Sequence, residues 1–77
     1  MKVYRVRLTS EEGFYEKCSL LAIGPPNDHG MCPIYKLPRR DLSKEKAEEL
    51  QAKILAAGQF DPANWEFARE YDASKIL

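Results

Sequence analysis

The chain has 77 residues, of which 44% are hydrophobic and 31% charged, and its formal net charge is zero. This composition is typical of a folded domain and excludes a disordered chain, while the zero net charge excludes attraction of the whole molecule to nucleic acid or to an anionic membrane. A chain of this length buries only about 60–65% of its unfolded surface, which is little for a deep catalytic pocket. We therefore expect one domain over residues 1–77 that is not an enzyme.

We expect neither a signal peptide nor a membrane span. The longest apolar run of the chain is Leu20 to Ile23, far short of the roughly 20 apolar residues that a membrane helix needs. Two cysteines, Cys18 and Cys32, do not form a disulfide framework. We expect a cytoplasmic protein with reduced thiols and no membrane partner.

Residues 2–8 predict the first strand. The apolar side chains of Val6 and Leu8 share one side of it, and the charged side chains of Arg5 and Arg7 share the other. This period of two is typical of a half-buried strand.

Two further strands are predicted before the middle of the chain. Residues 14–23 follow a turn and become apolar on both sides, which indicates a central strand paired antiparallel with the first. Residues 32–37 predict a third, short strand. Since Pro33 has no backbone N–H, and Pro38 follows the strand, we expect this segment to be an edge strand or irregular.

Residues 42–58 predict an amphipathic surface helix. Ser43 is a favourable N-cap, and Gly58 supplies the left-handed conformation that commonly ends a helix. The apolar side chains that recur every three or four residues on its inner face are Ala47, Leu50, Ile54 and Ala57. Such a helix must pack on another element, here the sheet.

The segment after this helix has two interpretations. As a strand, it places the aromatic side chains of Trp65, Phe67 and Tyr71 on one side. As a helix, it is capped by Asp61, has Pro62 in its first turn, and stacks Phe67 on Tyr71. We prefer the strand, because it brings all three aromatic side chains together.

The predicted fold class is therefore α+β, in the order β-β-β-α-β. A small antiparallel sheet of three or four strands carries one amphipathic helix packed on one face. Since one helix covers one face, the face that carries Arg5 and Arg7 is expected to be solvated or to form an interface.

Two candidate chemical sites are weak. His29 and Cys32, with Asp28 beside them, resemble zinc ligands, but a structural zinc site needs four ligands in close pairs, and Cys18 stands alone with thirteen residues between it and Cys32. Cys32 as a nucleophile with His29 as its base lacks a third, orienting group. We predict no metal, no cofactor and no catalytic residues.

The leading functional prediction is a non-catalytic interaction module that binds and modulates a larger protein, of the small accessory type known from bacteria and phages. Aromatic and arginine side chains are favoured in the buried centres of protein interfaces. The predicted protein-binding residues are Arg5, Arg7, Trp65, Phe67 and Tyr71. The protein is expected to be a monomer or a homodimer.

The alternative prediction is nucleic-acid binding through the basic first half. Residues 1–40 contain seven Lys and Arg against four Asp and Glu. The residues predicted to contact phosphates are Lys36, Arg39 and Arg40. The zero net charge of the whole chain places this alternative second.

Overall fold

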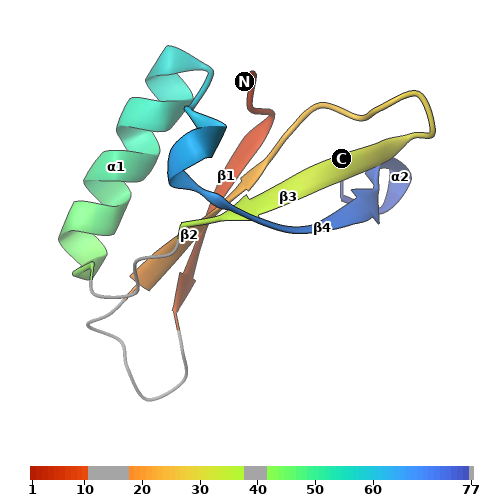
Figure 1. Ribbon diagram of the computed structural model, residues 1–77. Helices are drawn as coiled ribbons and strands as arrows, with labels where there is room; N and C mark the ends of the chain where they lie inside the picture. The colour runs from red at the N-terminus through yellow and green to blue at the C-terminus, as the bar shows by residue number, and fades with distance from the viewer. Residues whose placement is uncertain (11–17, 38–41, 77) are drawn as a thin grey trace.

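A computed structural model describes residues 1–10, 18–37 and 42–76. Its elements are β1 (Arg5–Ser10), β2 (Cys18–Ile23), β3 (Met31–Lys36), α1 (Lys44–Ala57), the 3-10 turn η1 (Pro62–Asn64), β4 (Glu66–Asp72) and α2 (Ala73–Ile76). The four strands form one antiparallel sheet in chain order, and α1 packs on β1 and β2 (Figure 1). The predicted α+β fold is confirmed. No helix in the part that the structure describes is long and apolar enough to cross a membrane.

The main core lies between β1, β2 and α1. Val6 pairs with Ala22, and Leu8 with Leu20, so that these side chains share the face that α1 covers. Leu20 and Ala22 are completely buried. The core is small, which agrees with the length of the chain.

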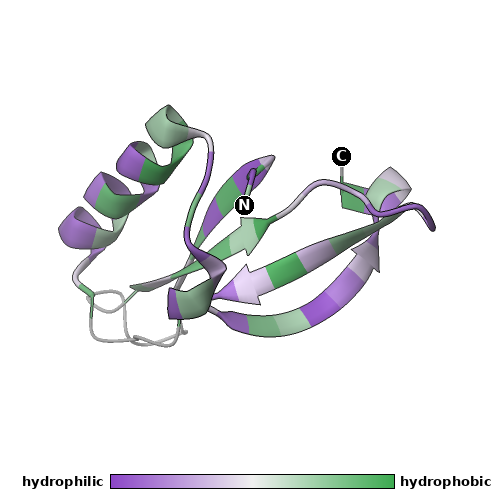
Figure 2. Cartoon of the chain, turned by 45° about the horizontal axis from the view of Figure 1, so that its top comes forward, coloured by the Kyte–Doolittle hydropathy of each residue, from purple (hydrophilic) through white to green (hydrophobic). Residues whose placement is uncertain are grey.

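Helix α1 begins and ends where the sequence predicts. The Ser43 hydroxyl accepts a hydrogen bond from the Lys46 N–H at 3.2 Å, and Gly58 has φ of 72°. Hydrophobic residues line the side of α1 that faces the sheet, and hydrophilic residues line the opposite side (Figure 2). The Gln51 side chain also donates to the Val6 carbonyl oxygen at 2.8 Å, which joins α1 to β1.

Strand β3 is interior, and the expectation of an edge strand is wrong. It pairs with β2 on one side and with β4 on the other. Pro33 is tolerated because it lies where the pairing with β2 ends: its carbonyl oxygen accepts from the Gly24 N–H at 2.9 Å, and Gly24 lies just past β2. The missing N–H therefore interrupts no central part of the ladder.

The segment after α1 combines both interpretations. Asp61 caps a single 3-10 turn with Pro62 at its start, and β4 follows as the preferred strand. The short helix α2 was not predicted. It follows β4 directly, and its Ala73 N–H donates to the Gly30 carbonyl oxygen at 2.9 Å.

Strand β1 begins later than predicted. Lys2 lies outside it and forms an isolated bridge with Gln59, two residues after the end of α1. The predicted start of the second strand at residue 14 lies outside the described residues, and the observed β2 begins at Cys18.

Candidate functional site

The pairing of β3 with β4 contains a bulge at Ala68. Ile34 pairs with Arg69 and Tyr35 with Phe67, so Ala68 has no partner across the ladder. Because Ile34 and Tyr35 point to opposite faces, so do Arg69 and Phe67. The prediction that Trp65, Phe67 and Tyr71 share one side is therefore wrong: Tyr71 follows Arg69 onto the face away from α1.

Four aromatic side chains form a continuous cluster on the α1 side. The ring centroids of Trp65 and Phe60 lie 4.9 Å apart, those of Phe60 and Tyr35 5.5 Å, and those of Tyr35 and Phe67 5.7 Å. Such tilted and edge-on pairs are favourable beyond the area that they bury. Tyr35 was not predicted to join this cluster, because its role depends on the cross-strand register.

An apolar groove lies beside this cluster, between α1 and η1. It has a volume of about 350 Å³ and is lined by Leu37, Leu50, Lys53, Ile54, Ala57, Gln59, Phe60, Asn64 and Trp65. Phe67 continues the aromatic cluster away from the groove, and 57% of it is exposed. We refer to the surface formed by these nine lining residues as the aromatic groove. It offers apolar contact area with a few polar groups around it.

The remaining predicted residues within the described part of the chain lie on the opposite face of the sheet, which we call the outer face. The side chains of β1, β2 and β3 alternate, and Val6, Leu20 and Tyr35 point toward α1. Arg5, Arg7 and Lys36 therefore point to the outer face. The predicted protein-binding site is thus divided between two surfaces, with Trp65 and Phe67 on one and Arg5, Arg7 and Tyr71 on the other.

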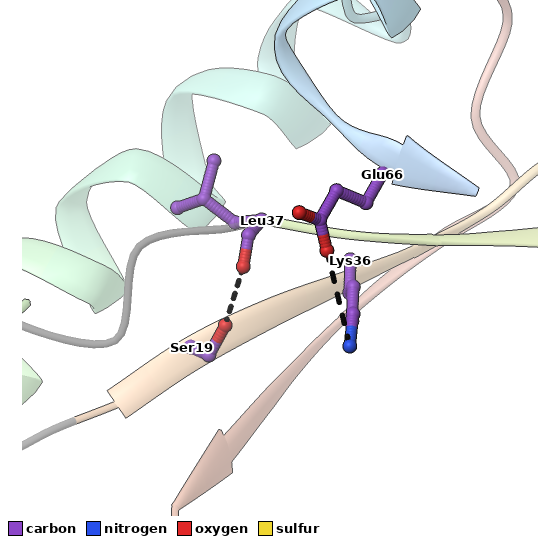
Figure 3. Close-up of polar contacts among 4 residues, drawn as sticks. All are labelled: Ser19, Lys36, Leu37 and Glu66. Atoms are coloured by element: carbon purple, nitrogen blue, oxygen red, sulfur yellow. Dashed lines mark hydrogen bonds and ion pairs between the residues drawn. The ribbon is translucent and has the colours of Figure 1, made fainter. Parts of the chain in front are cut away.

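The neighbouring side chains of Lys36 and Leu37 extend to opposite faces of the sheet. In Figure 3 the Lys36 side chain extends away from α1 and that of Leu37 extends toward it. The Lys36 ammonium lies 3.9 Å from a Glu66 carboxylate oxygen, and Ser19 on β2 donates to the Leu37 carbonyl oxygen at 3.1 Å (Figure 3). Arg39 and Arg40, the other two residues predicted to contact phosphates, lie outside the described residues.

The two cysteines are buried, whereas His29 is exposed. Cys18 and Cys32 are free thiols, both buried, and the accessible fraction of Cys32 is 0%. His29 is exposed in a turn that the Asn27 side chain closes by accepting from the His29 and Met31 N–H groups. Within residues 1–10, 18–37 and 42–76, no three His, Cys, Asp or Glu residues lie close enough together to hold a metal ion.

Comparisons with protein-family models, with curated proteins and with solved structures found no match to this chain.

Proposed function

We propose that this protein is a non-catalytic interaction module that binds a larger protein through the aromatic groove. The observation that carries this proposal is the continuity of the groove with an exposed aromatic side chain, Phe67. Exposed, contiguous apolar surface of this kind is typical of protein interaction sites. The proposed partner inserts an apolar side chain into the groove and packs over Phe67.

The lining of the groove supports binding rather than catalysis. The groove is lined by apolar and uncharged side chains apart from Lys53, whose ammonium pairs with Glu49 on the same helix at 3.6 Å. General acid or base catalysis needs a titratable group at the reacting atoms. We propose a cytoplasmic setting, in keeping with the two unpaired cysteines.

A matched pair of variants tests the proposed groove. Ala56 and Ala57 are adjacent, exposed residues in the last turn of α1, but only Ala57 lines the groove. We expect Ala57→Arg to block the groove and Ala56→Arg to leave it open, with similar effects on the helix. Each tagged variant is used to capture proteins from a nuclease-treated lysate of the organism that encodes the chain, and retained proteins are identified by mass spectrometry.

A partner retained in stoichiometric amount by the wild type and by Ala56→Arg, and lost with Ala57→Arg, would support the proposal. Equal retention by both variants would contradict it, as would the absence of any retained protein. A molecular mass of twice the monomer by light scattering, reduced by Ala57→Arg, would assign the groove to a second copy of this chain and would also contradict it.

A further inference from the structure

The outer face has a charge that the whole chain does not have. Its strand residues in the described part of the chain include four cations and one carboxylate. These charged residues are Arg5, Arg7, Lys36, Arg69 and Glu66. Since the whole chain is neutral, the compensating acidic residues lie elsewhere. Surfaces with one dominant sign of charge attract ligands of the opposite sign.

The first row across the outer face has arginine at both ends. The residues that face one another from β1 to β4 are Arg5, Ile23, Ile34 and Arg69. Arg5 and Arg69 are exposed, and Ile34 is half-buried. Because Ile23 is buried, the row offers two guanidinium groups with the half-buried Ile34 as the apolar surface between them.

The second row lies next to the first and has arginine at one end only. It consists of Arg7, Leu21, Lys36 and Glu66. Glu66 partly neutralises Lys36, at 3.9 Å (Figure 3), whereas Arg7 lies at the other end of the row and is exposed. The apolar surface thus continues from Ile34 to Leu21.

A cation–π pair, Arg69 and Tyr71, lies beside these rows. The guanidinium carbon of Arg69 is 4.9 Å from the centroid of the Tyr71 ring, a cation–π geometry. The bulge at Ala68 places both side chains on the outer face. Aromatic rings and guanidinium planes are the groups on which unpaired bases stack.

The short helix α2 limits this surface at one end. The Arg5 guanidinium donates to the Ile76 carbonyl oxygen at 3.4 Å, and Ile23 and Cys32 are buried on this side of the sheet. These contacts place α2 over this end of the outer face. The open part is therefore the region around Arg7, Leu21 and Arg69, and the half-buried Tyr71, which pairs with Cys32, lies at its border with α2.

We propose that the outer face binds single-stranded nucleic acid. Arg7 and Arg69 contact phosphates, and bases lie over Leu21, Ile34 and the Arg69–Tyr71 pair. Single-stranded nucleic acid fits because a flat sheet face admits splayed bases, whereas a duplex keeps its bases stacked inside. This inference goes beyond the proposed function and does not depend on the aromatic groove.

The test measures fluorescence anisotropy of labelled 20-nucleotide oligo(dT) and oligo(U) titrated with the full chain at low salt. The charge-reversal variant Arg7→Glu with Arg69→Glu is compared with Lys44→Glu and Lys46→Glu, two exposed residues of α1. Both double variants change the net charge equally. We expect the outer-face variant to lose at least about tenfold in affinity, and the α1 variant to change it less than about threefold.

The salt dependence gives a second readout. For single strands, log affinity falls with log salt, and each lost phosphate contact makes this slope shallower by about 0.7. The loss of two arginine contacts should therefore make it shallower by about 1.4. Circular dichroism melting confirms that each variant is folded.

Three results would overturn the proposal. The first is a wild-type dissociation constant weaker than about 100 µM at low salt. The second is an equal loss in the two double variants, which would show attraction without a site. The third is binding of polyglutamate but not of the oligonucleotides, which would assign the face to an acidic protein. Ala57→Arg should leave oligonucleotide binding unchanged. The proposal for the aromatic groove and the proposal for the outer face can therefore be contradicted independently of one another.

Discussion

Asp72 connects β4 to α2. It is the last residue of the strand, and its carboxylate accepts from the Ser74 hydroxyl at 2.8 Å and from the Ser74 N–H at 2.9 Å. The side-chain hydrogen bond is the larger cause, and both hydrogen bonds hold the pKa of Asp72 below its ordinary value of 3.8, since they favour the charged form. The carboxylate therefore helps to hold the start of α2 in place.

We predict that Ser74→Ala raises the pKa of Asp72 toward its ordinary value, and that Ser74→Thr, which keeps the hydroxyl, leaves it low. Because the pKa is lowered in the folded state, Asp72 stabilises the fold at pH values above its unfolded pKa. This contribution to the free energy of unfolding is lost as the pH falls through the folded pKa. Titration of the Asp72 carboxyl carbon by NMR gives this pKa directly. An identical pKa in the wild type and in Ser74→Ala would contradict this account.

Ala68 shows why the candidate site was only partly predictable at the scale of residues. A period of two predicts which side chains share a face only while every residue of a strand has a partner. One unpaired residue inverts the assignment for everything beyond it, so Tyr71 lies on the outer face and Phe67 on the other. Alanine and its neighbours carry no glycine or proline signal that would mark a bulge.

Elements with local signals were predictable. The cap at Ser43, the end at Gly58 and the inner face of α1 depend on residues within a few positions of one another. The interior position of β3 depends on where Pro33 falls relative to the end of β2, which is a property of the register and not of the sequence of β3. Helix α2 is four residues long and too short for a periodic pattern.

The two faces of α1 should respond differently to truncation. Ile54 is 8% exposed and packs in the core, whereas the adjacent Leu55 is 51% exposed. We predict that Ile54→Ala lowers the free energy of unfolding by about 2–4 kcal/mol, because it leaves a cavity, and that Leu55→Ala changes it by less than about 0.5 kcal/mol. Urea denaturation measures both.

Since so small a domain has little stability to lose, Ile54→Val serves as a milder variant. It should cost about 0.5–1.5 kcal/mol and keep the protein folded. Losses of similar size from Ile54→Ala and Leu55→Ala would show that α1 does not pack on the sheet through this face.

Burial is unevenly distributed over the whole molecule. Strand β2 is buried at four of its six positions, whereas all five residues of β4 from Glu66 to Glu70 are exposed. Helix α1 packs on β1 and β2 (Figure 1). The outer face includes Arg69 of β4, and Phe67 of β4 continues the aromatic cluster beside the groove, so both proposed ligands contact the strand that the core supports least.

This distribution predicts that β4 opens more easily than β2. Regions with few buried apolar contacts open at lower free energy than the core and exchange their amide hydrogens faster. We expect the amide hydrogens bonded between β4 and β3 to exchange at least about tenfold faster than those bonded between β2 and β1. NMR measures these exchange rates at a pH and temperature where local opening of the structure determines the rate. Equal protection would show instead that the sheet opens as one unit.

Phe67 and Arg69 flank the bulge of β4 and point to opposite faces. A ligand of either surface should therefore slow amide exchange in β4 first. The residues whose exchange slows most would show which surface the ligand occupies.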